Sequence, residues 1–249
     1  MKNRIEKAIF EGFKESYEDN YSFTGEISSI IKPESLIHIN IAKKIRIIND
    51  EHCNWGKPLE IKLEECTLTF ASSCVPLQAN PHDPFSSDYR EYHDSTRSGN
   101  IDIAIYVEGD SCFDRKPYAA IEIKDFIKTR GELRKDLIRN IEFLTLKDKI
   151  TGNSRLEVAY VACIHEHKGI FKYDEKQKEL DRLKAGYERY MEKFELASKD
   201  IKLRLEVATV AEYLIGIHDM NLPVEILEDK AAEAIHFIGV LVILEKQTK

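Results

Sequence analysis

The chain has 249 residues, of which 43% are hydrophobic and 33% are charged, and its formal net charge is −7. This length and composition are sufficient for one large globular domain with a substantial core. The acidic balance argues against a protein that coats nucleic acid through a uniformly basic surface, although a local basic groove or a bound metal ion would still allow a nuclease.

Neither a secretory leader nor a membrane-spanning helix is expected. The N-terminal segment lacks the continuous apolar stretch and the small-residue cleavage site of a signal peptide, and the longest apolar run, residues 236–244, has the length of a buried strand. We therefore expect a cytoplasmic protein without membrane contact. The five cysteines are widely spaced and form no C-x-x-C pair, which argues against a disulfide framework or a zinc knuckle.

The first part of the chain predicts two helices and then strand and loop. Apolar residues at helical spacing predict a packing helix over residues 2–18, and the motif "KPES" opens an isoleucine-rich helix that runs to about residue 50. Residues 59–70 alternate well enough for one strand or a bent pair of strands. The segment 72–100 is rich in Pro, Ser, Asp and Asn and is expected to be mostly loop.

The middle of the chain predicts the elements of a mixed sheet. Two strands are expected at about residues 101–107 and 118–124, followed by a helix over 131–147 and a buried strand over 155–164. Together with the preceding segments this gives the order helix, strand, strand, strand, helix, strand, which is typical of an α/β domain.

The last third is expected to extend this domain. A long helix over 174–198 carries apolar residues three and four apart, a narrow seam that would either dock on the core or pair with a second subunit in a homodimer. Segments 201–210 and 236–244 are expected to add strands. We therefore expect a single domain over 1–249, with a core at about 33–164 and a C-terminal helix and strands over 171–249.

Charged residues interrupt the two central strands, Asp102 in the first and Glu122 and Lys124 in the second. A symmetric hairpin register would place Asp102 opposite Glu122. Because side chains alternate along a strand, these two and Lys124 are expected on one face, with the isoleucines on the other. The same register makes further pairs: Ala104 with Ala120 and Tyr106 with Tyr118.

Two neighbouring carboxylates in a partly buried site repel each other, and a divalent cation would balance them. Mg²⁺ accepts one or two carboxylates and keeps positions for water and phosphate oxygens. Glu34 begins an apolar stripe on the second helix. The small side chains of Ala104 and Ala120 would let that helix pack on the charged face, so that Glu34 reaches the metal.

These residues resemble the motif of the PD-(D/E)xK nuclease superfamily, which has the restriction-endonuclease-like fold. The resemblance covers about residues 33–164 and consists of Glu34 early in a helix, Asp102 in "GNIDIAI", Glu122 and Lys124 in "AAIEIKDF", and the following helix "GELRKDLIRNIEFL". The residue before Asp102 is an isoleucine where the family name has proline. The resemblance implies a mixed central sheet flanked by helices.

The resemblance also implies Mg²⁺-dependent hydrolysis of phosphodiester bonds, with Mn²⁺ as a substitute and usually with DNA as the substrate. It implies that Asp102 and Glu122 bind the metal, that Lys124 is the catalytic lysine and that Glu34 is an auxiliary acid. The basic residues expected to contact the substrate lie just before the first catalytic strand and on the helix after the second: Arg97, Arg134, Lys135 and Arg139.

Weaker alternatives remain for these motifs. A second Glu-x-Lys triplet, Glu60 to Lys62, lacks both the preceding aspartate and the following basic helix and is interpreted as a solvated strand face. The central triplet itself would, on the simplest alternative, be a surface salt-bridge cluster. His165 and His167 could bind a transition metal, but with no third ligand nearby in sequence they are interpreted as a strand end.

The functional prediction is a magnesium-dependent deoxyribonuclease, restriction-like or active in antiviral defence. The acidic net charge and the lack of a recognisable DNA-binding module suggest an alternative, a nuclease-like subunit that receives DNA from a helicase or ATPase partner and is weak or inactive alone. RNA is a third possibility, because the chemistry at phosphorus is similar.

Overall fold

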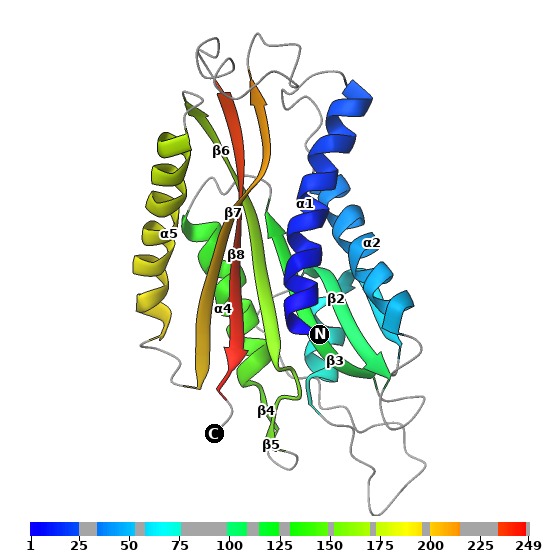
Figure 1. Ribbon diagram of the computed structural model, residues 1–249. Helices are drawn as coiled ribbons and strands as arrows, with labels where there is room; N and C mark the ends of the chain where they lie inside the picture. Colours follow the sequence, from blue (N-terminus) through cyan, green and yellow to red (C-terminus); the bar gives the residue numbers. More distant parts are fainter. Residues whose placement is uncertain are drawn as a thin grey trace, which may run out of the picture.

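The computed structural model describes residues 1–24, 34–52, 58–75, 99–108, 115–124, 130–148, 152–169, 173–195, 200–214 and 234–247. They form a mixed α/β structure in which a six-stranded sheet is flanked by helices (Figure 1). The strands, in their order across the sheet, are β1 (Leu59–Cys66), β2 (Asn100–Glu108), β3 (Arg115–Lys124), β6 (Val158–Gly169), β8 (Ala234–Lys246) and β7 (Ile201–Leu214). Only β3 and β6 pair in parallel among these six, and the remaining pairs are antiparallel.

Helices pack on both faces of this sheet. One face is covered by α1 (Lys2–Thr24) and α2 (Glu34–His52), and the other by α3 (Thr67–Ser73), α4 (Arg130–Thr145) and α5 (Tyr173–Glu195). The short strands β4 (Lys147–Asp148) and β5 (Gly152–Asn153) form a separate ribbon. The parallel pairing of β3 with β6 follows from the α4 crossover between them, because parallel strands require such a connection.

Helix α2 has the apolar stripe that its sequence predicts, but the stripe packs on the other face of the hairpin. Ile37, Ile41 and Ile45 are fully buried and lie in one cluster with the isoleucines of β2 and β3. The expectation that α2 packs on the charged face is therefore wrong. The physical reason is the amount of apolar surface buried. The isoleucines of α2 bury more of it when they pack on the isoleucine face of the hairpin than they would on the face with Ala104 and Ala120.

The space beside Ala104 and Ala120 is filled by aromatic rings from the other side. Phe70 of α3 packs edge-on against Tyr106 and Phe143, with ring centroids 5.6 Å and 5.1 Å apart. Phe70 and its neighbours form the helix α3, so the prediction of strand through residue 70 is wrong. Because Phe70, Ala71 and Cys74 are all buried, helical spacing suits this segment better than alternation.

The predicted hairpin register is correct in its centre and wrong near the turn. Ala104 pairs with Ala120, as the symmetric register predicts. Tyr106 pairs with Pro117 rather than with Tyr118, because the register shifts between Ile105 and Tyr106. Proline has no N–H to donate to a ladder and is tolerated at such an irregularity.

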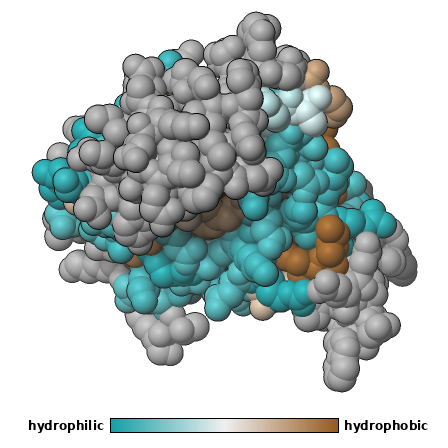
Figure 2. All heavy atoms as spheres, turned by 45° about the horizontal axis from the view of Figure 1, so that its top comes forward, coloured by the Kyte–Doolittle hydropathy of each residue, from teal (hydrophilic) through white to brown (hydrophobic). Residues whose placement is uncertain are grey.

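Helix α5 docks on the sheet, one of the two arrangements expected for its seam. Tyr187 and Met191 are buried in the same cluster as α4. Among the described residues, no helix combines the length and the hydropathy that crossing a membrane requires. The described surface seen in Figure 2 is mostly hydrophilic, and hydrophobic side chains occupy small separate areas of it.

Candidate functional site

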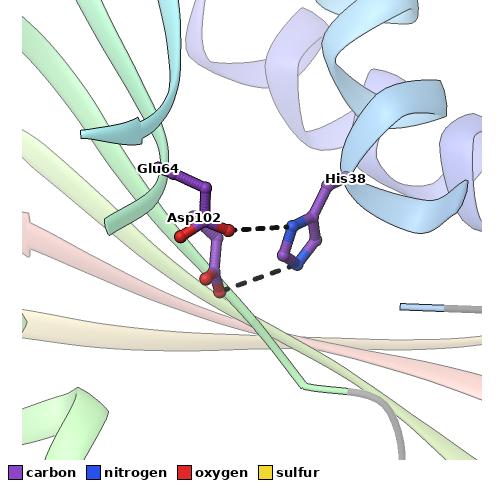
Figure 3. A group of neighbouring side chains, drawn as sticks. All are labelled: His38, Glu64 and Asp102. Carbon is purple, nitrogen blue, oxygen red and sulfur yellow. Dashed lines mark ion pairs between the residues drawn. The ribbon is translucent and has the colours of Figure 1, made fainter. Parts of the chain in front are cut away.

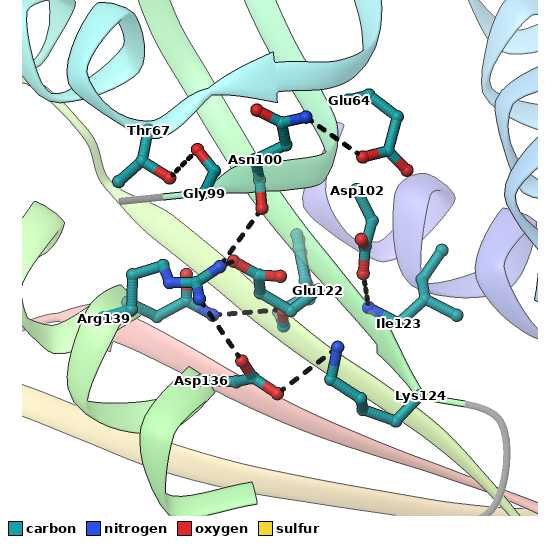
Figure 4. Close-up of polar contacts among 12 residues, drawn as sticks. Glu64, Thr67, Gly99, Asn100, Asp102, Glu122, Ile123, Lys124, Asp136 and Arg139 are labelled. Atoms are coloured by element: carbon teal, nitrogen blue, oxygen red, sulfur yellow. Dashed lines mark hydrogen bonds and ion pairs between the residues drawn. The ribbon is translucent and has the colours of Figure 1, made fainter. Parts of the chain in front are cut away.

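The predicted site residues lie where the β2–β3 ladder ends. The last pair in the ladder is Ile103 with Ile121, so Asp102 and Glu122 are the next residues on each strand. Strand β3 continues to Lys124, held by its parallel pairing with β6. The charged side chains thus gather at the divergence of the two strands, between α2 and α4 (Figure 4).

Asp102 is held at this divergence by a backbone contact. Its Oδ2 accepts a hydrogen bond of 2.5 Å from the N–H of Ile123, in place of a ladder carbonyl. Its side chain is 13% exposed and faces His38 of α2. Burial is the main cause that raises the pKa of Asp102, and the hydrogen bond and the charge of Lys124 oppose it.

Glu122 is the most deeply buried acid of the site. Its side chain is 1% exposed, and its Oε1 lies 2.8 Å from Nη1 of Arg139 on α4. Burial and then the negative charge of Asp102 raise the pKa of Glu122 to about 8, against the opposing effect of Arg139. Burial therefore favours the protonated form of Glu122 over the charged form when no cation besides Arg139 and Lys124 is close to it.

Lys124 keeps its positive charge although it is partly buried. Burial alone would lower its pKa, but the charges of Asp136, Asp102 and Glu122, with a smaller effect of Glu34, raise it above the ordinary value. Its Nζ lies 3.7 Å from Oδ2 of Asp136. Lys124 is therefore a cation and hydrogen-bond donor here rather than a base that could take a proton.

Glu34 approaches the site from the first turn of α2. Its charge acts on Lys124, which places it within electrostatic reach although α2 packs on the isoleucine face. Asp102 contacts α2 and Glu122 contacts α4, and these helices cover opposite faces of the sheet, so the expectation that both acids lie on one face of the hairpin is wrong. The physical reason is that the β2–β3 ladder ends next to the two acids, so Asp102 is no longer held by pairing with β3 and turns toward α2. The charge of Asp102 nevertheless raises the pKa of Glu122, and the charges of both acids raise the pKa of Lys124, so the three groups lie within electrostatic reach of one another.

The predicted substrate-binding residues have different environments. Arg139 points inward, where Nη1 also donates to the carbonyl oxygen of Asn100 at 3.2 Å. Arg134 and Lys135 are exposed on α4, where they would be accessible to a polyanion. Arg97 lies outside the described residues.

Three residues that the sequence did not single out belong to the same site. His38 faces Glu64 and Asp102 across a short gap, with Nδ1 3.6 Å from Glu64 Oε1 and Nε2 3.9 Å from Asp102 Oδ2 (Figure 3). One ligand atom from each of these residues lies within 4.8 Å of the others, a spacing that could hold a metal ion. Asp136 of α4 is the third addition, between Lys124 and Arg139.

Only part of this set had a signal in the sequence. His38 follows Glu34 by four residues, so both lie on one side of α2. Asp136 precedes Arg139 by three residues, which likewise makes them helix neighbours. Glu64 had no such signal, because its position opposite Asp102 depends on how β1 pairs with β2.

The backbone at Glu64 is strained. Its φ is 53°, in the left-handed region, which costs a non-glycine residue about 1 kcal/mol. Glu64 also lies at the level of Asp102 in the β1–β2 ladder, and like charges in such a position repel. A cation between the two carboxylates would convert this repulsion into attraction.

The described part of the site carries more acids than bases. Its cations are Lys124 and Arg139, and its carboxylates are Glu34, Glu64, Asp102, Glu122 and Asp136. This donor set fits a divalent cation: the carboxylates suit Mg²⁺, and the imidazole of His38 adds a ligand that Mn²⁺ accepts. The second Glu-x-Lys triplet has a different environment. Lys62 pairs with Glu60 at 3.0 Å, and both side chains are more than a third exposed, which agrees with a solvated strand face.

Comparison of the chain with family models, with curated proteins and with solved structures finds no match.

Proposed function

We propose that this chain is a metal-dependent nuclease of the restriction-endonuclease-like fold that hydrolyses phosphodiester bonds in DNA. The observation that carries the proposal is the meeting of two buried acids and a charged lysine, Asp102, Glu122 and Lys124, at the divergence of two central strands. The element order α2, β1, β2, β3, α4, β6 agrees with the layout expected for such a core, with α3 inserted. A restriction-like or antiviral role belongs to the same proposal.

The chain's own residues have separate tasks in this proposal. Asp102 and Glu122 would hold Mg²⁺ or Mn²⁺. His38 and Glu64, which form one group of candidate ligands with Asp102, would be further donors. The bound ion would supply an activated water and stabilise the charge that develops on the phosphate. Lys124, as an ammonium, would orient that water and stabilise the same charge through its N–H donors.

The basic residues of α4 favour a polyanionic substrate. Arg134 and Lys135 are exposed on the same helix that brings Arg139 to Glu122. Arg139 would exchange its present carboxylate partner for a phosphate oxygen, since a guanidinium binds both groups in similar geometry.

The test is a cleavage assay of the purified chain on linear and circular DNA, with RNA in parallel. We expect cleavage of DNA in Mg²⁺ or Mn²⁺ and none in EDTA. Lys124→Met should lower the rate by about 10²-fold or more, because a cation is removed from the reacting centre. Lys62→Met, in the second Glu-x-Lys triplet, is the matched control and should cleave at the wild-type rate.

Two results would contradict the proposal. Cleavage that persists undiminished in EDTA would exclude a metal-dependent reaction, and cleavage that is the same in Lys124→Met and the wild type would exclude the predicted site. Cleavage of RNA but not of DNA would correct the substrate while it preserved the site.

A further inference from the structure

We propose a second metal site, suited to Zn²⁺, formed by His167, His236 and Glu212. The three residues lie in a row on neighbouring strands: β6 pairs His167 with His236, and β7 pairs Glu212 with the same His236. Directly paired residues project from the same face of a sheet. His167 lies four residues beyond Cys163, the β6 partner of Lys124, which is about 13 Å along the strand. The inference is therefore independent of the proposed nuclease function.

The centre of this row is a buried pair of polar atoms that face each other without a hydrogen bond. The side chain of His236 is 3% exposed, and its Nδ1 lies 3.3 Å from Oε1 of Glu212. Neither atom has a hydrogen-bond partner within the described ranges. Buried polar atoms are nearly always satisfied, so such a pair requires an explanation. A cation bound to both atoms provides one.

The separation of these two atoms suits joint binding of zinc. Zinc lies about 2.0–2.1 Å from nitrogen and oxygen ligands, so two ligands of a tetrahedral site are about 3.3 Å apart. The other carboxylate oxygen of Glu212 accepts a hydrogen bond of 2.6 Å from Lys176 of α5. This contact orients the carboxylate and leaves Oε1 directed at His236.

His167 belongs to the sequence motif, and the strand pairing places His236 and Glu212 beside it as the ligands that the motif lacked. The Nδ1 of His167 lies 3.6 Å from Oε1 of Glu179 on α5, so a turn of the ring would bring Nδ1 within hydrogen-bonding distance of a carboxylate, as at many metal-binding histidines. Its ring lies near that of His236 with centroids 6.2 Å apart, and it would have to turn to bring Nε2 to the ion, because these three residues do not yet have the ligand spacing found at His38, Glu64 and Asp102. The side chain is 33% exposed, which gives the ring freedom to turn toward the ion. A Cβ at Gly169 would lie 2.8 Å from this Nε2, so glycine leaves room there.

The chemistry of the donors selects the kind of metal. Two imidazoles with one carboxylate suit zinc and similar transition ions, whereas Mg²⁺ prefers oxygen ligands alone. Burial lowers the pKa of His236, which favours the neutral ring that binds metal. Three protein ligands leave a fourth position for water or for a small anion.

The test uses the full chain and Co²⁺ as a spectroscopic probe, with Zn²⁺ as competitor. We expect one Co²⁺ per chain to give the visible absorption of a four-coordinate site and to be displaced by Zn²⁺, in addition to any Co²⁺ bound at the candidate nuclease site. Glu212→Gln and His236→Gln should each weaken Co²⁺ binding by at least about 10-fold. Glu166→Gln, an exposed change of the same kind on β6, is the matched control and should bind as the wild type does.

Circular dichroism establishes whether each variant is folded. If His236→Gln does not fold, Glu212→Gln tests the site alone, because its position is partly exposed. Wild-type chain that binds no Co²⁺, or equal affinity in folded Glu212→Gln, would overturn the site. Asp102→Asn should retain the Co²⁺ spectrum. Loss of the spectrum in that variant would assign the ion to the candidate nuclease site and overturn the zinc-site proposal. A wild-type chain that does not cleave DNA would contradict the proposed nuclease function but not the zinc site.

Discussion

Replacement of Glu122 by glutamine is expected to abolish metal-dependent cleavage and, at the same time, to stabilise the metal-free protein at alkaline pH. The amide keeps the size of the side chain but cannot carry the charge that would hold the cation. We expect the cleavage rate to fall by about 10³-fold or more, as when charge stabilisation at a reacting centre is lost. The measurement is a single-turnover cleavage assay in Mg²⁺.

The gain in stability follows from the pKa of Glu122. The folded protein raises this pKa from 4.5 to about 8, so the folded state binds the proton more tightly than the unfolded chain does. The stabilisation is complete below pH 4.5 and is lost as the pH rises toward about 8, with a slope of at most ~1.4 kcal/mol per pH unit. Glutamine is neutral throughout and avoids this loss.

Urea unfolding at several pH values measures the effect. Wild type and Glu122→Gln should be similar near pH 5, and the variant should be more stable at pH 9 by at least about 1 kcal/mol. Glu132→Gln, an exposed change of the same kind on α4, should leave the wild-type pH dependence unchanged. A variant that cleaves normally, or one whose stability declines with pH as steeply as that of the wild type, would refute this account of Glu122.

Replacement of Gly12 by alanine is expected to cause the largest loss of stability from a single added methyl group. Helices α1 and α2 approach so closely that a Cβ at Gly12 would lie 2.6 Å from Cγ1 of Ile41 and 2.7 Å from its Cα and N. The backbone atoms of Ile41 cannot rotate away from the new methyl group as a side chain could, so the two helices would have to separate. Alanine favours a helix by about 1 kcal/mol over glycine, and overpacking should outweigh this, for a net loss of about 2 kcal/mol.

The separation would also reach the candidate site, because α2 carries both Glu34 and His38. We therefore expect reduced cleavage as well as a lower urea midpoint for Gly12→Ala. Gly186→Ala on α5 is the matched control, since a Cβ there would meet no atom within 4 Å, and it should gain about 0.5–1 kcal/mol. Equal or higher stability of Gly12→Ala would show that α1 and α2 can adjust without cost.

The sequence was most informative where one periodicity decided the structure. The isoleucine stripe of α2 follows from side-chain spacing and the central pairing of Ala104 with Ala120 from a symmetric hairpin register, and both are confirmed. The face on which α2 packs could not be read from its own pattern. That choice depends on competition between α2 and α3 for the two faces of the hairpin, and α3 was not predicted.

The candidate site was predictable only in its central residues. Asp102, Glu122 and Lys124 stand out because they interrupt apolar strands, and the structure brings them to the same end of the ladder. Glu64 joins them through the pairing of β1 with β2 and through its left-handed backbone conformation, which a glutamate in the sequence does not predict. Likewise, the row of His167, His236 and Glu212 connects segments far apart in the chain, so spacing could not reveal it.

The position of β8 has a consequence for how the protein is made. In the described sheet β8 lies between β6 and β7, although it is the last of the three to leave the ribosome. Until β8 emerges, β7 has no neighbour to receive its backbone hydrogen bonds, and β6 presents an open, apolar edge to solvent. The nascent chain therefore passes through a stage in which β7 is separate from the sheet of β1, β2, β3 and β6. Insertion of β8 then pairs it with β6 and β7 at the same time and completes the sheet.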